Sequence, residues 1–111
     1  MSIASDIIRG HTDTIILARL CAGDSYGYEI NKAIVKKTGG RYELKEATLY
    51  TAFRRLEENG CIRSYWGNET TGARRRYYAI TDAGKSAFHS LKAEWQDARA
   101  MIDSLTDMEG Y

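Results

Sequence analysis

The chain has 111 residues, of which 43% are hydrophobic and 28% are charged, and its formal net charge is +1. This length predicts a single domain, and the composition is that of a folded protein rather than a disordered one. No apolar run reaches the roughly 18 residues that would span a membrane, and residues 1–10 lack the basic and apolar layout of a signal peptide, so we expect a cytoplasmic protein without a membrane partner.

Two helices are predicted in the first third of the chain. Isoleucines and leucines recur at helical spacing over residues 3–21, and Gly10 interrupts this pattern, so the first turns are expected to form a separate or bent piece. A second helix is predicted over residues 26–38. Asp24 or Ser25 is its expected N-cap, because short polar side chains accept hydrogen bonds from the first free N–H groups of a helix.

A third helix is predicted over residues 46–59. Leu49 and Phe53 lie on one face of it at a spacing of one turn, and polar and charged side chains cover most of the rest. Gly60 is expected to end the helix. Lys45 stands where a capping side chain would be expected, and the missing cap lowers the stability of this helix slightly.

Two strands and a long helix complete the chain. Residues 61–67 and 74–80 are rich in strand formers, and the polar, glycine-containing loop 68–73 between them suits a hairpin. Thr81 is expected to cap a final helix over residues 82–105, which would span about 36 Å at the usual helical rise.

The order of elements predicts a mainly α fold with a two-stranded β-hairpin. Three helices followed by a hairpin describe a winged helix-turn-helix, here extended by a long C-terminal helix. We expect residues 1–80 to form a DNA-binding domain whose N-terminal helix also lies at a dimer interface. Residues 81–106 are the expected dimerisation helix, and residues 107–111 a flexible tail.

A basic centre of the chain favours an anionic partner. Residues 41–85 contain nine Lys or Arg against six Asp or Glu, whereas residues 86–111 contain two against five. The third helix is the candidate recognition helix for the major groove of double-stranded DNA, and the hairpin is the candidate wing. The expected DNA contacts are Lys45, Thr48, Tyr50, Thr51, Arg54, Arg74, Arg75 and Arg76.

The three arginines of the wing are adjacent in the sequence. Because side chains alternate between the faces of a strand, Arg74 and Arg76 are expected to share one face, with Arg75 on the other. A basic triplet alone is more often a solvated patch than a binding site. Its place on a hairpin directly after a helix-turn-helix favours contacts with phosphates.

The last helix carries a narrow apolar stripe with the a/d spacing of a coiled coil. The stripe consists of Phe88, Leu91, Trp95, Ala98, Ile102 and Leu105. Its first turns are expected to pack on their own domain and the remainder on a second subunit, which predicts a homodimer and a palindromic operator. Trp95 is either ordinary packing in the dimer core or a stacking surface for a planar ligand. Arg99, one turn on, would favour anionic or neutral ligands there.

No catalytic, metal or cofactor site is predicted. Cys21 and Cys61 form no CxxC pair and are interpreted as small buried residues in a reducing compartment. His11 and His89 are far apart and form no spaced cluster with the cysteines. No nucleophile–base pair or phosphate-binding loop is visible, so an enzyme is not expected.

Four segments together resemble the PadR family of bacterial transcription regulators. They are Tyr26 to Ile30, Ala47 to Thr51, Arg55 to Gly60, and Gly72 to Gly84. Each is a modest signal, but their order and spacing are specific, and the likeness extends over about residues 5–105.

Within that family the chain most resembles the branch of lactococcal multidrug-resistance regulators, which shares a tryptophan at the place of Trp95. The resemblance implies a repressor that dimerises by packing its last helix on the partner's first helix, where Ile8 lies. It also implies a flat pore at that interface, with Ile7 and Lys92 beside Trp95, for an aromatic effector. Lys92 and Arg99 replace an aromatic and an acidic residue of that branch.

A second hypothesis is a winged-helix module for protein interaction that does not bind DNA, because a fold does not fix a function. Such a module is expected to expose an apolar patch on the third helix and the hairpin. The polar face of the helix and the three arginines favour DNA.

Overall fold

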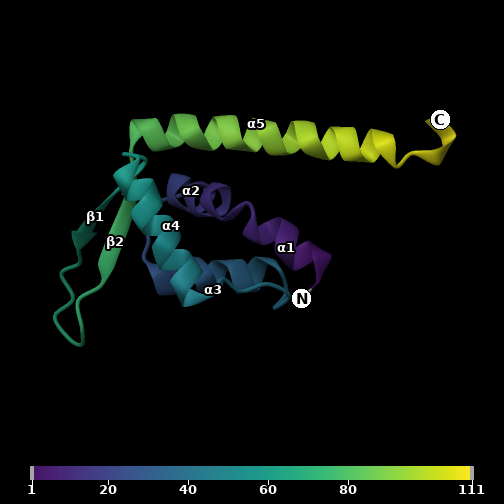
Figure 1. Cartoon of the computed structure of the whole chain (residues 1–111). Helices are drawn as coiled ribbons and strands as arrows, with labels where there is room; N and C mark the ends of the chain where they lie inside the picture. The colour runs from purple at the N-terminus through teal and green to yellow at the C-terminus, as the bar shows by residue number, and fades with distance from the viewer. Residues whose placement is uncertain (1, 111) are drawn as a thin grey trace.

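The computed structural model describes residues 2–110 and shows a helical body, a protruding hairpin and a long last helix (Figure 1). Met1 and Tyr111, the ends of the predicted domain and the predicted tail, lie outside the described residues. The elements are α1 (Ile3–Arg9), α2 (Thr12–Cys21), α3 (Gly27–Lys37), α4 (Glu46–Glu58), β1 (Ile62–Trp66), β2 (Arg76–Ile80), α5 (Asp82–Leu105) and a short 3-10 helix, η1 (Met108–Gly110). The predicted fold class is confirmed.

The predicted first helix is two helices. Gly10 caps the C-terminal end of α1. Its N–H donates to the carbonyl of Asp6 at 3.2 Å and the N–H of His11 donates to that of Ile8 at 2.9 Å, while α2 begins at Thr12. The threonine hydroxyl donates to the carbonyl oxygen of Arg9 at 2.6 Å, which fastens the two helices at the bend. The interruption expected at the glycine is therefore a true break.

The predicted N-cap of the second helix is wrong. The capping position of α3 is Tyr26, and it makes no side-chain cap. Ser25 is instead held in an isolated bridge, because its N–H donates to the carbonyl of Tyr78 at 3.2 Å and its carbonyl accepts from the Tyr78 N–H at 2.8 Å. Its hydroxyl donates to Glu29 at 2.5 Å, and Asp24 accepts from the hydroxyl of Tyr65. The chain before α3 thus serves to attach the helical body to the hairpin.

The core lies between α2, α3 and α4 and is closed by the hairpin. Ile16, Leu17 and Ile30 are fully buried there. The ring of Phe53 stacks on Tyr78 of β2, with ring centroids 3.9 Å apart. Burial of these side chains stabilises each by about 1.5–3 kcal/mol relative to exposure. The stack also joins α4 to the wing, so the two candidate DNA-binding elements are in direct contact.

The connection before α4 is held by an amide clamp. The side chain of Asn31 donates to the carbonyl of Leu44 at 2.9 Å and accepts from its N–H at 3.0 Å. Leu44 itself is buried in the core. Lys45 is the N-cap residue and makes no side-chain cap, as the sequence predicts. The start of α4 is therefore fixed by the preceding loop rather than by a cap.

The hairpin passes directly into α5. The hydroxyl of Thr81 accepts from the Gly84 N–H at 3.1 Å, which confirms the predicted cap, and it donates to the carbonyl of Gly60 at 2.6 Å. A Cβ atom at Gly84 would lie 2.0 Å from the carbonyl oxygen of Cys61, so only glycine fits this crossing. The direction of α5 is set by these contacts at its first turn.

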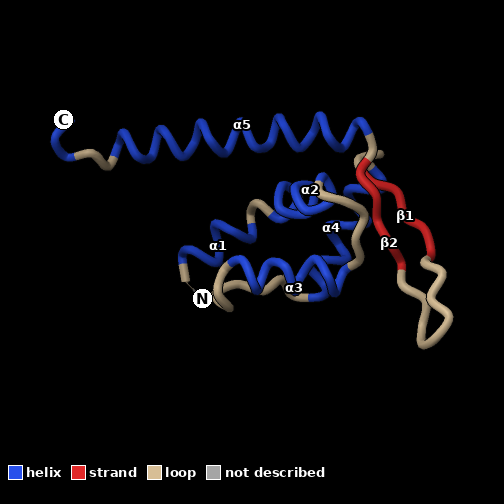
Figure 2. Tube along the Cα trace, turned by 180° about the vertical axis from the view of Figure 1, so that it is seen from behind, coloured by secondary structure: helices blue, strands red, loops and turns tan. Residues whose placement is uncertain are grey.

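α5 runs along the α2 and α1 side of the body, and its C-terminal turns extend past it (Figures 1 and 2). The molecule measures 62 × 30 × 21 Å along its principal axes. Phe88 and Leu91 pack on the core, as expected for the first turns, whereas Trp95, Ile102 and Leu105 are 39%, 59% and 62% exposed. The predicted stripe is therefore half covered by its own chain and half open.

Cys21 is exposed and Cys61 is only partly buried, so the prediction that both are buried is wrong for Cys21, which lies at the last position of α2.

Among residues 2–110, no helix is both long and apolar enough to cross a membrane.

Candidate nucleic-acid interface

The exposed face of α4 is opposite to its core face. Leu49, Ala52, Phe53 and Leu56 are the buried residues of this helix. The helical period therefore turns Thr51 and Arg54 directly to solvent, and both are exposed. Tyr50 is 45% exposed, and its hydroxyl lies against the first turn of α3, 3.0 Å from the place of a Cβ atom on Gly27. Thr48 lies on the flank toward α2 and is partly buried.

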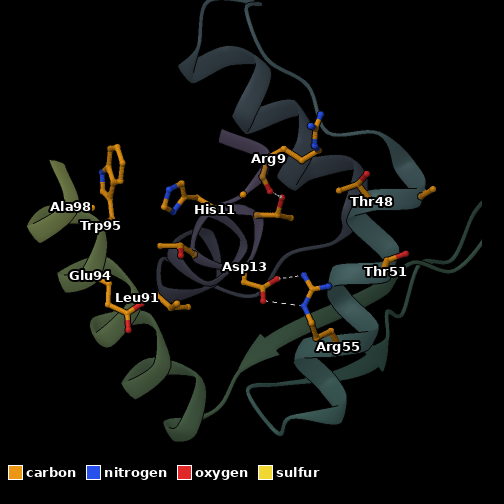
Figure 3. Close-up of a pocket in the computed structure, with 14 residues that line it drawn as sticks. Arg9, His11, Asp13, Thr48, Thr51, Arg55, Leu91, Glu94, Trp95 and Ala98 are labelled. Atoms are coloured by element: carbon orange, nitrogen blue, oxygen red, sulfur yellow. Dashed lines mark hydrogen bonds and ion pairs between the residues drawn. The ribbon is translucent and has the colours of Figure 1, made fainter. Parts of the chain in front are cut away.

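An ion pair ties the recognition-helix candidate to α2. The guanidinium of Arg55 donates from Nε to Oδ2 of Asp13 at 3.1 Å and from Nη2 to Oδ1 of the same carboxylate (Figure 3). These hydrogen bonds raise the pKa of Arg55 above its ordinary value, and burial opposes them slightly. A bidentate pair fixes orientation as well as distance. It therefore adds to the core packing of α4 in holding the rotation of this helix against α2.

Replacing Asp13 with asparagine is expected to lower the free energy of unfolding by about 0.5–1 kcal/mol, the upper range for exposed pairs, because the bidentate contact is lost. Asp6→Asn is the matched control, since Asp6 makes a one-point pair with Arg9 at 2.7 Å within α1. The control substitution is expected to lower the free energy of unfolding by no more than about 0.3 kcal/mol. Urea unfolding at equal protein concentration measures both, and equal losses would contradict the anchoring role of Asp13.

The wing separates its arginines as the strand period predicts. The guanidinium carbons of Arg74 and Arg76 lie 5.9 and 5.7 Å from the ring centroid of Trp66 on β1. Arg75 is on the opposite face, 4.9 Å from the ring of Tyr26. Because Trp66 pairs with Arg76, these two residues and Arg74 share one face of the hairpin. The same face carries Tyr78, which packs on α4.

Arg76 is also anchored to α4. Its Nη2 donates to the hydroxyl of Ser64 at 2.7 Å and lies 3.7 Å from Oε1 of Glu57. The same hydroxyl donates to Oε2 of Glu57 at 2.7 Å. This chain of contacts aligns the wing arginines with the exposed face of α4.

A carboxylate organises the tip of the wing. Glu69 accepts from the Arg75 N–H at 2.8 Å and from the hydroxyl of Tyr77 at 3.2 Å, and Nη1 of Arg75 lies 3.9 Å away. The backbone hydrogen bond, with the tyrosine hydrogen bond and the nearby guanidinium, lowers the pKa of Glu69 below its ordinary value. The loop is therefore held by the ionised form of this side chain.

The order of the wing tip is expected to depend on pH through Glu69. Because the pKa of Glu69 is lowered in the folded protein, the stabilisation that it gives to the wing tip is complete above the ordinary glutamate pKa. This stabilisation is lost as the pH falls through the lowered folded pKa. The Arg75 amide proton, observed by NMR, should titrate with a midpoint below that of an ordinary glutamate. The titration should vanish in Glu69→Gln, and its persistence there would assign it to another group.

Two hollows meet at Trp95. A groove of about 760 Å³ runs between α2, α4 and α5 and is lined by Thr48 and Thr51 on one side and by Leu91, Trp95 and Ala98 on the other (Figure 3). A smaller apolar hollow of about 390 Å³ lies between α1 and Trp95. It includes Ile7 and Ile8. The imidazole of His11 meets the indole edge to face, with centroids 4.8 Å apart, and belongs to both hollows.

Two of the predicted ligand residues do not join this site in the single chain. Neither Lys92 nor Arg99 lines either hollow. The flank of α5 that faces the body is that of Leu91 and Ala98, and the helical period places Lys92 and Arg99 on the other flank of Trp95. Nζ of Lys92 lies 5.8 Å from the ring of Phe88 instead. The expectation that Arg99 sets the charge of a cavity at the dimer interface stays a prediction, because the single chain does not contain that interface.

The sequence prediction also missed two exposed aromatic residues. Trp66 is 53% exposed beside the wing arginines, and Tyr28, in the first turn of α3, is 71% exposed. The strand period gave a usable signal for Trp66, since it places Ile62, Ser64 and Trp66 on one face of β1.

Within residues 2–110, no cluster of three or more His, Cys, Asp or Glu side chains has the arrangement of a metal site.

A winged helix with an exposed polar helix and a basic wing is the architecture of DNA-binding regulators. Comparisons agree with this class. Residues 16–90 match the model of the "Transcriptional regulator PadR-like family". The chain is 50% identical to a transcriptional regulator from Clostridium thermocellum, whose structure superposes with a TM-score of 0.86 over 96% of this chain and 100% of that one.

Two further relatives support the assignment. A PadR family transcription regulator from Clostridium difficile is 35% identical, with a TM-score of 0.72 over 86% of this chain and 97% of that one. An uncharacterized protein from Lysinibacillus sphaericus is 44% identical over 97% of both chains. The chain belongs to the PadR-like family of transcriptional regulators. Regulators of this family bind DNA, are typically dimeric and are not enzymes.

Proposed function

We propose that this regulator is a cytoplasmic repressor that binds a palindromic operator as a homodimer. The observation that carries the proposal is the alignment of two surfaces. The exposed face of α4, with Thr51 and Arg54, and the wing face, with Arg74 and Arg76, are joined through the Phe53–Tyr78 stack and the contacts of Arg76 with α4. A helix in the major groove and a wing on the adjacent backbone would use both surfaces at once.

The contacts of this proposal divide into two kinds. Lys45, at the N-terminal end of α4, and the wing arginines are suited to phosphates, which position the protein without reading sequence. The hydroxyls of Thr48, Tyr50 and Thr51 and the guanidinium of Arg54 are the candidates for base edges. Of these, Thr48 and Thr51 also line the groove beside Trp95, so the same helix would face both DNA and an effector.

The second subunit is proposed to cover the open half of α5. Residues 1–80 would then serve DNA binding and residues 81–106 dimerisation. The proposed interface comprises Ile8 of α1 and Phe88, Leu91, Trp95, Ala98, Ile102 and Leu105 of α5. Trp95, Ile102 and Leu105 stay substantially exposed in the single chain, and solvated apolar stripes of this kind are typical of helix–helix interfaces.

The finer proposal is membership of the multidrug-binding branch, with a planar aromatic effector that releases the repressor from DNA. Trp95 offers a stacking surface at the junction of the two hollows, and Ile7 supplies part of the apolar wall. Lys92 and Arg99 would take part only at the interface between subunits, on the far flank of Trp95. The alternative role of Trp95 is packing in the dimer core.

Displacement of bound DNA tests the effector proposal. Anilinonaphthalene sulfonate is a suitable probe because its naphthalene ring is planar and aromatic, and its negative charge opposes binding to DNA. Adding it to the complex of the protein with a labelled upstream duplex should release the duplex and enhance the dye fluorescence. Trp95→Ala should remove both effects. Retained dye binding in that variant would place the ligand elsewhere, and dye binding without release would contradict an effector role.

The protein-interaction module is less well supported. An exposed apolar patch over α4 and the wing would favour it, but the exposed aromatic Trp66 there is flanked by guanidiniums. Family membership also places the chain among DNA-binding regulators.

A further inference from the structure

Trp66 is an exposed indole with an unusual setting. It is 53% exposed at the last position of β1, where the hairpin leaves the body. Single exposed hydrophobic residues are common and need no explanation. This one, however, lies within 6 Å of two guanidiniums, at 5.9 Å for Arg74 and 5.7 Å for Arg76. Such cation–π contacts hold all three side chains in one plate of mixed apolar and cationic character.

The plate lies on the same side of the wing as α4. The strand pairs Ser64↔Tyr78 and Trp66↔Arg76 belong to one face of the hairpin. Nearer the body, Tyr78 of that face stacks on Phe53 of α4. Farther out, the strands continue into the loop at the tip, away from the helical body (Figure 2). The plate therefore borders the space between α4 and the wing.

The charge of the plate favours an anionic occupant. Arg76 is partly neutralised by Glu57 at 3.7 Å. Arg74 donates from Nε to the carbonyl of Gly67 at 3.1 Å, and among the described residues no salt bridge is recorded for it. One guanidinium is thus uncompensated beside an exposed indole. Deoxyribose and phosphate alternate along a DNA strand in the same way, an apolar sugar edge beside an anion.

We propose that Trp66 is a DNA-contact residue, which packs on the deoxyribose of the strand that passes between α4 and the wing while Arg74 and Arg76 bind its phosphates. This inference rests on DNA binding by the wing. The indole contributes apolar contact and an N–H donor, neither of which changes the number of phosphates neutralised. Trp66 therefore adds affinity without adding to the salt dependence, whereas the arginines add both.

Two tryptophans make the contact directly observable. The chain contains Trp66 and Trp95 and no other tryptophan, so Trp95→Phe leaves the wing indole as the single reporter. The probe is a fluorescein-labelled duplex of about three helical turns at low salt, where binding does not require a known operator. Anisotropy of the label gives the bound fraction, and acrylamide quenching gives the exposure of Trp66. The indole should be readily quenched in the free protein and protected in proportion to the bound fraction.

The substitution series separates this contact from its neighbours. Trp66→Ala should weaken binding about tenfold with an unchanged salt slope, as expected for loss of a half-covered aromatic side chain. Trp66→Phe should retain most of the affinity. Tyr28→Ala is the matched control, since Tyr28 is an exposed aromatic residue of α3 outside the plate, and it should leave Trp66 protection intact.

Each other outcome overturns the proposal. If the duplex binds while Trp66 stays open to acrylamide, DNA binding holds and the contact does not exist. If Trp66 is already protected in the free protein, a protein surface covers the plate. If Trp66→Ala lowers the salt slope as much as loss of an arginine, the indole acts only by positioning Arg74 and Arg76. If the unsubstituted protein binds no duplex at low salt, the proposed function fails together with this inference.

Discussion

Replacing Arg74 and Arg76 together with alanine is expected to weaken DNA binding by about 100-fold or more, because a dimer would lose four phosphate contacts. The salt slope should fall by about 3.6, since each neutralised phosphate contributes about 0.9 to it. Both guanidiniums lie on the α4 side of the wing, beside Trp66. Fluorescence anisotropy of a labelled duplex across a salt series gives both quantities.

Arg75→Ala is the matched control for this change. Arg75 belongs to the same triplet but stacks on Tyr26, 4.9 Å from the ring centroid, and pairs with Glu69 on the other face. Its loss should lower the salt slope by clearly less than loss of either neighbour, and it should loosen the wing tip. If all three single substitutions change the slope equally, the triplet acts as a diffuse positive charge, and the face-specific account is contradicted.

Changing Ile102 and Leu105 to glutamate is expected to produce a folded monomer. Both side chains are exposed in the single chain, so the helical body does not depend on them. In a dimer they would be buried, and an unpaired buried carboxylate costs several kcal/mol, so the dimer dissociation constant should rise at least about a thousandfold. Light scattering should give a mass near 12.5 kDa, with the circular dichroism of a folded helical protein.

Ser104→Glu is the control for that experiment. Ser104 is exposed on the face of α5 opposite to the stripe and should leave the dimer intact. Leu91→Glu is less informative, because Leu91 packs on the core and its replacement should unfold the domain as well. A stable dimer in the double variant would show that the subunits meet elsewhere.

The sequence was a good guide to the elements because each begins or ends at a distinct local signal. Gly10 marks the break between α1 and α2, and Thr81 caps α5 through its own hydroxyl. Such signals act within a few residues and do not require the rest of the fold. The alternation of Arg74, Arg75 and Arg76 between the faces of the wing follows from strand geometry in the same way.

Errors arose where distant segments compete for a side chain. Ser25 has the chemistry of an N-cap, but its backbone pairs with Tyr78, more than fifty residues later in the chain, and its hydroxyl turns to Glu29. The spacing of Arg99 from Trp95 places it on a neighbouring face of α5, but this spacing alone does not reveal which flank of the helix the body covers. Contacts of this kind depend on tertiary packing and are not encoded in any local pattern.

In the candidate site, too, some features follow from local patterns and others depend on contacts between distant segments. The recognition helix and the wing could be placed from order and spacing alone. The ion pair between Asp13 and Arg55 could not be predicted in that way, because it joins residues 42 positions apart. The pairing of Trp66 with two arginines needed the register of the hairpin.

The central claim, a sequence-selective DNA-binding regulator, is tested most directly by anisotropy of a labelled duplex from the region upstream of its own gene, with a scrambled duplex of the same composition and a salt series. The account predicts tight binding to the upstream duplex, a steep salt dependence, and at least about a thousandfold preference over the scrambled duplex. Absence of binding to either duplex at low salt would contradict it.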